Sequence, residues 1–239
     1  MIELRPLQIT ALVFAVLAFF LTFSAILTPA WQVVYAREIQ QWIQSGLWLN
    51  CQTRPSGMYT CTYSFSEHDF DFYTNAETIN LRTPPFYSWQ RSLLAVYLIA
   101  QFITFLSFSS FFCSLNLQTR QLSAISFAVL ISITFLIHSG TTLAFAVFTQ
   151  MVEYRFYHVS VSGIYEKHWG YSFYIELFVL LFLFLSMCFA IAFLIQERMN
   201  KTNNNNYRLA TANTADFYGL DPYETRLAMR ELPNVPKYR

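Results

Sequence analysis

The stretch Gly46-Leu47-Trp48-Leu49-Asn50-Cys51, with Cys61 ten positions after the first cysteine, decides the fold of this chain. It lies in a polar segment, residues 31–91, between two long apolar runs. A connection of about 60 residues is too long to lack structure of its own. The two cysteines could close a small loop in an oxidising compartment, and such a crosslink would stabilise the fold by about 3 kcal/mol. The sequence therefore predicts a small stapled lobe.

The residues around the cysteines favour short β-strands. Residues 59–65 are rich in Tyr, Thr and Phe, and Asp69 and Asp71 alternate with aromatic residues. Such alternation is typical of strands with one wet face. Trp48 fits two interpretations: a tryptophan of the belt at the membrane surface, or one packed against the small sheet beside the disulfide. Its place three residues before Cys51 favours packing.

The composition indicates a membrane protein. The chain has 239 residues, of which 55% are hydrophobic and 12% are charged, and it contains 25 Phe. A soluble domain usually carries about 25% charged residues. The net charge of +1 offers no basic field for nucleic acid, so we expect no nucleic-acid partner.

Four apolar segments are long enough to cross a bilayer, which takes about 20 residues. The first run is longer than the apolar core of a signal peptide, and no small-residue cleavage site stands out before Trp31, so we expect it to be retained. The predicted fold class is an all-α bundle of four transmembrane helices with a small extracellular β-sheet lobe. The expected helices are residues 7–30, 92–115, 122–150 and 171–196.

The orientation of the spans follows from charge and from the cysteines. Arg and Lys are frequent after Gln196, which favours the cytoplasm for that end, but residues 151–170 also carry two basic side chains. The cysteine pair therefore decides the orientation, with the long segment outside and both termini in the cytoplasm. The remaining predicted parts are a cytoplasmic N-terminus (1–6), a cytoplasmic loop (116–121), a second extracellular loop (151–170) and a disordered cytoplasmic tail (197–239).

These motifs carry a resemblance to a known family. Gly46-Leu47-Trp48, two residues, Cys51, nine residues and Cys61 are similar to the signature of the claudin superfamily, which includes peripheral myelin protein, epithelial membrane protein and calcium-channel gamma subunits. Trp31 resembles the tryptophan that opens the first extracellular segment there, and Arg91 resembles the arginine at the entry to the second helix. The stretch 169–174 is similar to the start of the fourth helix in the myelin-protein and gamma branches.

Several departures from that pattern suit a divergent invertebrate claudin-like protein, such as those of the nematode Clc-like group. About a dozen extra residues separate Cys61 from Arg91, and the third helix lacks the aromatic exit of many claudins. The last residue is Arg239, which does not suit the groove of a PDZ domain. We therefore expect no PDZ scaffold as a partner.

The resemblance implies a plasma-membrane protein of cell–cell junctions, active in adhesion or in a paracellular barrier through its extracellular loops. Besides the lipid bilayer, its partners would be copies of itself in the same or an opposing membrane. If such assemblies line pores, Glu67, Asp69 and Asp71 would favour cations. The alternative is an auxiliary, gamma-like subunit that regulates the gating or trafficking of a channel or receptor. Stretch 169–174 favours this alternative.

The sequence offers no catalytic residues, no cofactor-binding motif and no metal-ligand spacing, so we expect neither an enzyme nor a bound cofactor. Two ionisable residues lie within the spans. We expect His138 to be a packing residue with Gln101 as its partner, beside small residues that allow close helix contact. We expect Glu176 to pair with Arg91 or Arg155, or to reach the lipid headgroups.

Overall fold

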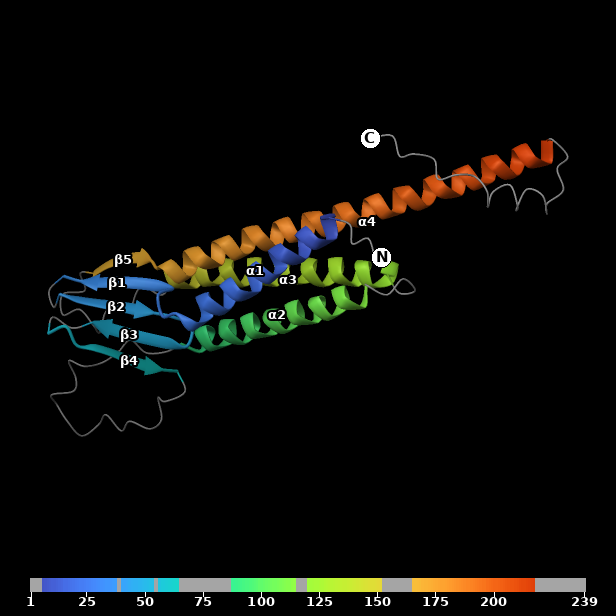
Figure 1. Cartoon of the computed structure of the whole chain (residues 1–239). Coiled ribbons are helices and arrows are strands. Elements are labelled where there is room, and N and C mark those ends of the chain that lie inside the picture. Colours follow the sequence, from blue (N-terminus) through green and yellow to red (C-terminus); the bar gives the residue numbers. More distant parts are fainter. Residues whose placement is uncertain are drawn as a thin grey trace. The chain divides into compact units, whose positions relative to one another are not determined.

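The computed structural model describes residues 6–37, 40–53, 56–64, 87–114, 120–151 and 165–217 (Figure 1). The chain divides into two compact units, residues 1–192 and 193–239. The first unit contains a helix bundle and a β-sheet. The described part of the second unit is helical, residues 193–217.

Within the described ranges, four helices are long and apolar enough to cross a membrane. They are α1 (Pro6–Leu27), α2 (Ser88–Cys113), α3 (Arg120–Met151) and α4 (Tyr171–Phe217). Many of their large apolar side chains point outward, as expected for a bundle whose solvent is lipid. Helix α1 shows this arrangement well, because its buried face is a stripe of small residues: Ala11, Ala15, Ala18, Thr22 and Ala25. The chain is therefore a multi-pass membrane protein, as its composition predicts.

A five-stranded antiparallel sheet lies at one end of this bundle (Figure 1). Its strands are β1 (Gln32–Ala36), β2 (Gln41–Ser45), β3 (Leu49–Thr53), β4 (Tyr59–Tyr63) and β5 (Tyr165–Trp169), in the order β4-β3-β2-β1-β5. Four strands come from the long connection between α1 and α2. The predicted fold class, a four-helix membrane bundle with a small β lobe, is thus confirmed.

Strand β5 comes from the connection between α3 and α4, where we expected only a loop. It pairs with β1 over its whole length, from Gln32 opposite Trp169 to Ala36 opposite Tyr165. Its sequence, Tyr-Glu-Lys-His-Trp, has little apolar alternation, so a local pattern does not reveal it. The strand forms because β1 offers it a complete row of backbone partners.

Helix α4 continues beyond Gln196, where the sequence predicts the fourth span to end and a disordered tail to begin. The helix is described through Phe217. Adding residues to an existing helix avoids the unfavourable nucleation step, so even an Asn-rich segment can follow an apolar one in helical form. The remainder of the expected tail, residues 218–239, lies outside the described residues.

An apolar cluster lies where the sheet meets the helices. At its centre is Trp31, which is fully buried and packs its ring against Tyr97 of α2 and Phe145 of α3, at centroid distances of 5.4 and 5.0 Å. Leu47 from the β2–β3 turn and Phe173 from α4 join the same cluster. Ala25 and Ile26 of α1 belong to it as well. Side chains of the lobe and of all four helices therefore share one core, which holds the sheet against the bundle.

Candidate functional site

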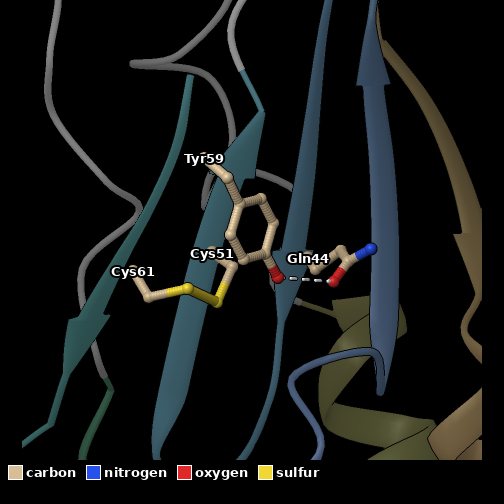
Figure 2. The surroundings of a disulfide bond; sticks show 4 residues. All are labelled: Gln44, Cys51, Tyr59 and Cys61. Carbon is tan, nitrogen blue, oxygen red and sulfur yellow. Dashed lines mark hydrogen bonds between the residues drawn. A yellow bond between two sulfur atoms is a disulfide. The ribbon is translucent and has the colours of Figure 1, made fainter. Parts of the chain in front are cut away.

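The disulfide predicted by the cysteine spacing is present. Cys51 of β3 lies directly opposite Cys61 of β4 in the antiparallel register, and their Cα atoms are 4.1 Å apart. The bond crosslinks the edge strand to its neighbour (Figure 2). In the same view, the Tyr59 hydroxyl donates a hydrogen bond of 3.3 Å to Oε1 of Gln44.

The Gly46-Leu47-Trp48 motif forms the turn between β2 and β3. A Cβ on Gly46 would lie 2.9 Å from the Leu49 carbonyl oxygen and 3.0 Å from the Cα of Pro29, so only glycine fits. Leu47 is fully buried in the core under the sheet. The Trp48 indole nitrogen donates a 2.8 Å hydrogen bond to the carbonyl of Ile26, near the end of α1. Each residue of the motif thus attaches this turn to the first helix and its continuation.

Trp48 also contacts the sheet, because its ring lies 5.5 Å from that of Tyr63 on β4. Trp31 makes a similar hydrogen bond to α1. Its indole nitrogen donates a 2.7 Å hydrogen bond to the carbonyl of Ala25. Both tryptophans satisfy carbonyls in the last turns of α1, which the helix itself leaves without donors.

The start of α2 is also hydrogen-bonded to the lobe. The Gln90 side chain is fully buried and donates a 2.8 Å hydrogen bond to the Gly46 carbonyl. Arg91 donates to Ser64, from Nε to the hydroxyl at 2.9 Å and from a terminal nitrogen to the carbonyl at 3.1 Å. Ser64 follows β4 and bonds through its backbone N–H to the Trp48 carbonyl at 2.9 Å. The arginine therefore joins α2 to the end of the disulfide-linked hairpin.

Backbone hydrogen bonds join the segment after α1 to the start of α4. The backbone N–H of Gly170 donates to the Trp31 carbonyl at 3.1 Å, and that of Ser172 donates to the Ala30 carbonyl at 3.0 Å. The hydroxyls of Thr28 and Ser172 are 2.7 Å apart. These bonds bring the starts of β1 and α4 together, which explains why β5 can pair with β1.

The structure corrects the expected partners of His138 and Glu176. Nδ1 of His138 on α3 lies 2.6 Å from Oε1 of Glu176 on α4, and both side chains are buried. Gln101, the expected partner of His138, instead donates to the Phe19 carbonyl at 3.1 Å. Arg91 bonds to Ser64, and Arg155 lies outside the described residues.

The prediction that small residues beside His138 allow close helix contact is wrong for Gly140. A Cβ placed on Gly140 would meet nothing within 4 Å, so this glycine does not mediate close helix packing. The neighbouring Thr142 is the residue that makes contacts. Its hydroxyl lies 3.0 Å from that of Tyr97 on α2 and donates to the His138 carbonyl at 2.8 Å.

The face of the sheet that carries the disulfide also presents an aromatic row. Tyr35 lies opposite Trp42, Trp42 opposite Thr53, and Thr53 opposite Tyr59, so the row crosses four strands. The rings of Tyr35 and Trp42 are in contact at 4.6 Å. Trp42 is 46% exposed and Tyr59 is 54% exposed. We call Tyr35, Trp42 and Tyr59 the aromatic row.

The hydroxyl of Tyr59 stays protonated at physiological pH. Partial burial, with a smaller contribution from the Tyr171 hydroxyl, raises the pKa of Tyr59 above its ordinary value of 10.0. The neutral hydroxyl can therefore donate to Gln44. The three side chains of the aromatic row are thus uncharged, and the row ends beside the exposed Arg37–Glu166 ion pair, because Glu166 lies opposite Tyr35. Aromatic residues and arginine are common in protein–protein contacts.

Other predicted site residues are not brought together by the described structure. Glu67, Asp69 and Asp71, the acids expected to face ions, lie outside the described residues. Within the described ranges, no group of three His, Cys, Asp or Glu side chains is placed to hold a metal ion. The two remaining cysteines, Cys113 of α2 and Cys188 of α4, are exposed and form no disulfide.

Comparison with known proteins agrees with this arrangement. The model of the Clc-like family matches residues 5–219. The chain is 46% identical over 235 residues to Clc-like protein 2 of Caenorhabditis elegans, an alignment that covers 95% of this chain and 93% of that protein. It is also 29% identical over 185 residues to Clc-like protein 5 of the same organism, covering 72% of this chain and 64% of that protein. The chain therefore belongs to the Clc-like family, a claudin-related group of membrane proteins.

Proposed function

We propose that this protein is a claudin-like adhesion or barrier protein of the plasma membrane. In this proposal the β lobe lies outside the cell and both termini lie in the cytoplasm. The Cys51–Cys61 disulfide supports the orientation, because structural disulfides persist in oxidising compartments and are rare in the cytosol. Four spans then place both ends of the chain on the cytoplasmic side.

The observation that carries the proposal is the aromatic row on a lobe that is attached to the bundle at several points. Trp48, Arg91 and Gly170 each link the sheet to a different helix. A lobe held in this way loses little conformational entropy when it binds a partner. Exposed Trp and Tyr side chains on such a surface are frequent hot spots of protein–protein contacts.

We propose that the partner of the aromatic row is a second copy of this chain. Neutral aromatic rings stack well on rings of the same kind, so the row can pack against itself in a two-fold arrangement. Contact across two apposed membranes would produce adhesion, and contact within one membrane would assemble the strands of a barrier.

A cell-aggregation assay tests this function. Non-adherent cells that express the chain are expected to cluster, and clustering should fall to the level of untransfected cells for the double variant Trp42→Ser and Tyr59→Ser. Phe102→Ala is the matched control, because Phe102 is an aromatic residue of α2 that is 62% exposed on the bundle and not on the sheet. Equal surface expression must be verified. Clustering that survives the double variant would refute the aromatic row as the adhesive surface.

A second candidate is an auxiliary subunit of an ion channel or receptor. It is favoured by the outward face of α4 just after β5, where Tyr171, Tyr174 and Phe178 are each more than half exposed. Such a face can pack against helices of a larger membrane protein as readily as against lipid. Co-purification with a channel, together with altered gating, would support this role. Enrichment of the protein at cell–cell borders without such a complex would favour adhesion.

A further inference from the structure

We infer that a small cavity between β1, β5 and the end of α3 binds the headgroup phosphate of a membrane phospholipid that has an N–H donor beside the phosphate. The cavity has a volume of about 160 Å³ and is lined by Gln32, Gln150, Lys167, His168 and Trp169. Binding pockets for drug-sized ligands usually measure about 300–1,000 Å³, so this one suits only a small polar group.

The cavity is lined by a buried amide that lacks hydrogen-bond partners among the described residues. Gln32 opens β1 and is 2% exposed, yet neither its Nε2 nor its Oε1 has a hydrogen-bond partner in the described part of the chain. A buried amide without partners is costly, so native proteins supply them from protein, water or ligand. Because the Gln32 side chain lines the cavity, a group bound there can accept from Nε2 and donate to Oε1.

Lys167 places a positive charge beside the cavity. Lys167 lies on β5 opposite Val34, so it shares a sheet face with Gln32, which lies opposite Trp169. Its ammonium group donates to the carbonyl of Thr149, in the last turn of α3, and this bond holds the charge beside the cavity. A lysine and an amide N–H together favour an anion, and phosphate is an anion that lysine binds well.

The cavity lies near the ends of the membrane-spanning helices. Gln150 lies next to the end of α3, Trp169 precedes the start of α4, and Gln32 follows soon after the end of α1. Three membrane-spanning helices therefore end around the cavity, which places it at the depth of the lipid headgroups. Tryptophan is typical of this depth, and lysine side chains near helix ends extend to the same interface.

The cavity favours a headgroup that carries a hydrogen-bond donor beside its phosphate. Phosphate oxygens can accept from Lys167 and from Nε2 of Gln32, whereas Oε1 of Gln32 requires a donor. Phosphatidylethanolamine has both a phosphate and an ammonium N–H. Phosphatidylcholine has the same phosphate, but its quaternary ammonium carries no N–H. The cavity should therefore distinguish these two lipids even when their acyl chains are identical.

Native mass spectrometry of the full chain in detergent tests the inference. Phosphatidylethanolamine and phosphatidylcholine with the same acyl chains are titrated in competition. The wild-type protein should retain the ethanolamine lipid several-fold more than the choline lipid. Absence of this preference in the wild-type protein would overturn the inference without any variant, so the test does not depend on how the variants fold.

Variants then assign the site. Lys167→Gln should weaken binding of both lipids, roughly tenfold for loss of a charge-assisted hydrogen bond, and Lys167→Arg should restore much of it. Gln32→Leu should abolish the preference between the two lipids. The matched controls are Arg37→Gln, a cation that pairs with Glu166 on the sheet surface, and Gln44→Leu, a glutamine on the opposite sheet face. Unchanged binding in both Lys167→Gln and Gln32→Leu would overturn the site.

A soluble competitor distinguishes a lipid from a free phosphate compound. Glycerophosphoethanolamine carries the same headgroup without acyl chains. We expect it to displace the lipid only at concentrations far above those at which the lipid binds, because the acyl chains contribute most of the affinity from the bilayer side. Tight binding of the soluble compound, with no retention of the lipid, would overturn the assignment to a membrane phospholipid.

Discussion

Nδ1 of His138 and Oε1 of Glu176 lie 2.6 Å apart in the core of a membrane bundle, where neither side chain is exposed. The pair joins α3 to α4. The ring of His138 also lies 5.4 Å from that of Tyr97, so the pair contacts α2 as well. Polar groups at this depth are costly without partners, and the three helices must therefore assemble in one arrangement to satisfy them.

Removing one member of this pair should destabilise the bundle more than removing both. Glu176→Leu leaves the His138 imidazole buried without its partner, and we expect a loss of roughly 1–3 kcal/mol in the free energy of unfolding. The double variant His138→Leu and Glu176→Leu leaves neither polar side chain without its partner and should recover part of that loss. Unfolding in detergent measures both. Strictly additive losses in the double-mutant cycle would show that the two side chains do not interact.

Gly170 should tolerate no side chain. A Cβ there would lie 1.9 Å from the Ala30 carbonyl oxygen, so Gly170→Ala must displace the backbone where α1 meets α4, at a cost of about 1–3 kcal/mol. The matched control is Gly140→Ala, where a Cβ meets nothing within 4 Å and alanine improves helix propensity by about 1 kcal/mol. Thermal unfolding should separate the two variants in opposite directions. Equal stability of the two variants would contradict the described junction.

Arg91 should be replaceable by lysine only in part. Lysine keeps the charge but cannot donate to both the hydroxyl and the carbonyl of Ser64 in the geometry of a guanidinium. Because Arg91 is exposed to solvent, we expect Arg91→Lys to cost only about 1 kcal/mol. Limited proteolysis should report faster cleavage after β4 in this variant. An unchanged cleavage rate would mean that the arginine does not hold the hairpin to α2.

The acids between β4 and α2 should set ion preference if the protein lines paracellular pores. We predict a cation preference in epithelial layers that express the chain, and a smaller preference after Glu67→Gln, Asp69→Asn and Asp71→Asn are combined, because the field of three carboxylates is removed. Dilution potentials across the layer measure it. If the ratio of cation to anion permeability is the same before and after the change, these residues do not set ion preference.

The four spans and the paired cysteines could be predicted from local sequence, because long apolar runs and a close Cys pair each carry a physical constraint of their own. Strand β5 could not, since Tyr165–Trp169 becomes a strand through pairing with β1, far away in the sequence. The His138–Glu176 pair was missed for a similar reason. Its members lie on different helices, and their contact depends on the rotation and depth of both helices, which hydropathy does not specify.

The account depends most on the sheet being oxidised and outside the cell, and labelling of cysteines on intact cells tests this directly. In a Cys113→Ser and Cys188→Ser background, Cys51 and Cys61 are the only cysteines of the chain. A membrane-impermeant maleimide should fail to label untreated cells and should label both cysteines after an impermeant reductant is added. Labelling that needs no reductant and occurs only after permeabilisation would place free thiols in the cytosol and contradict the account.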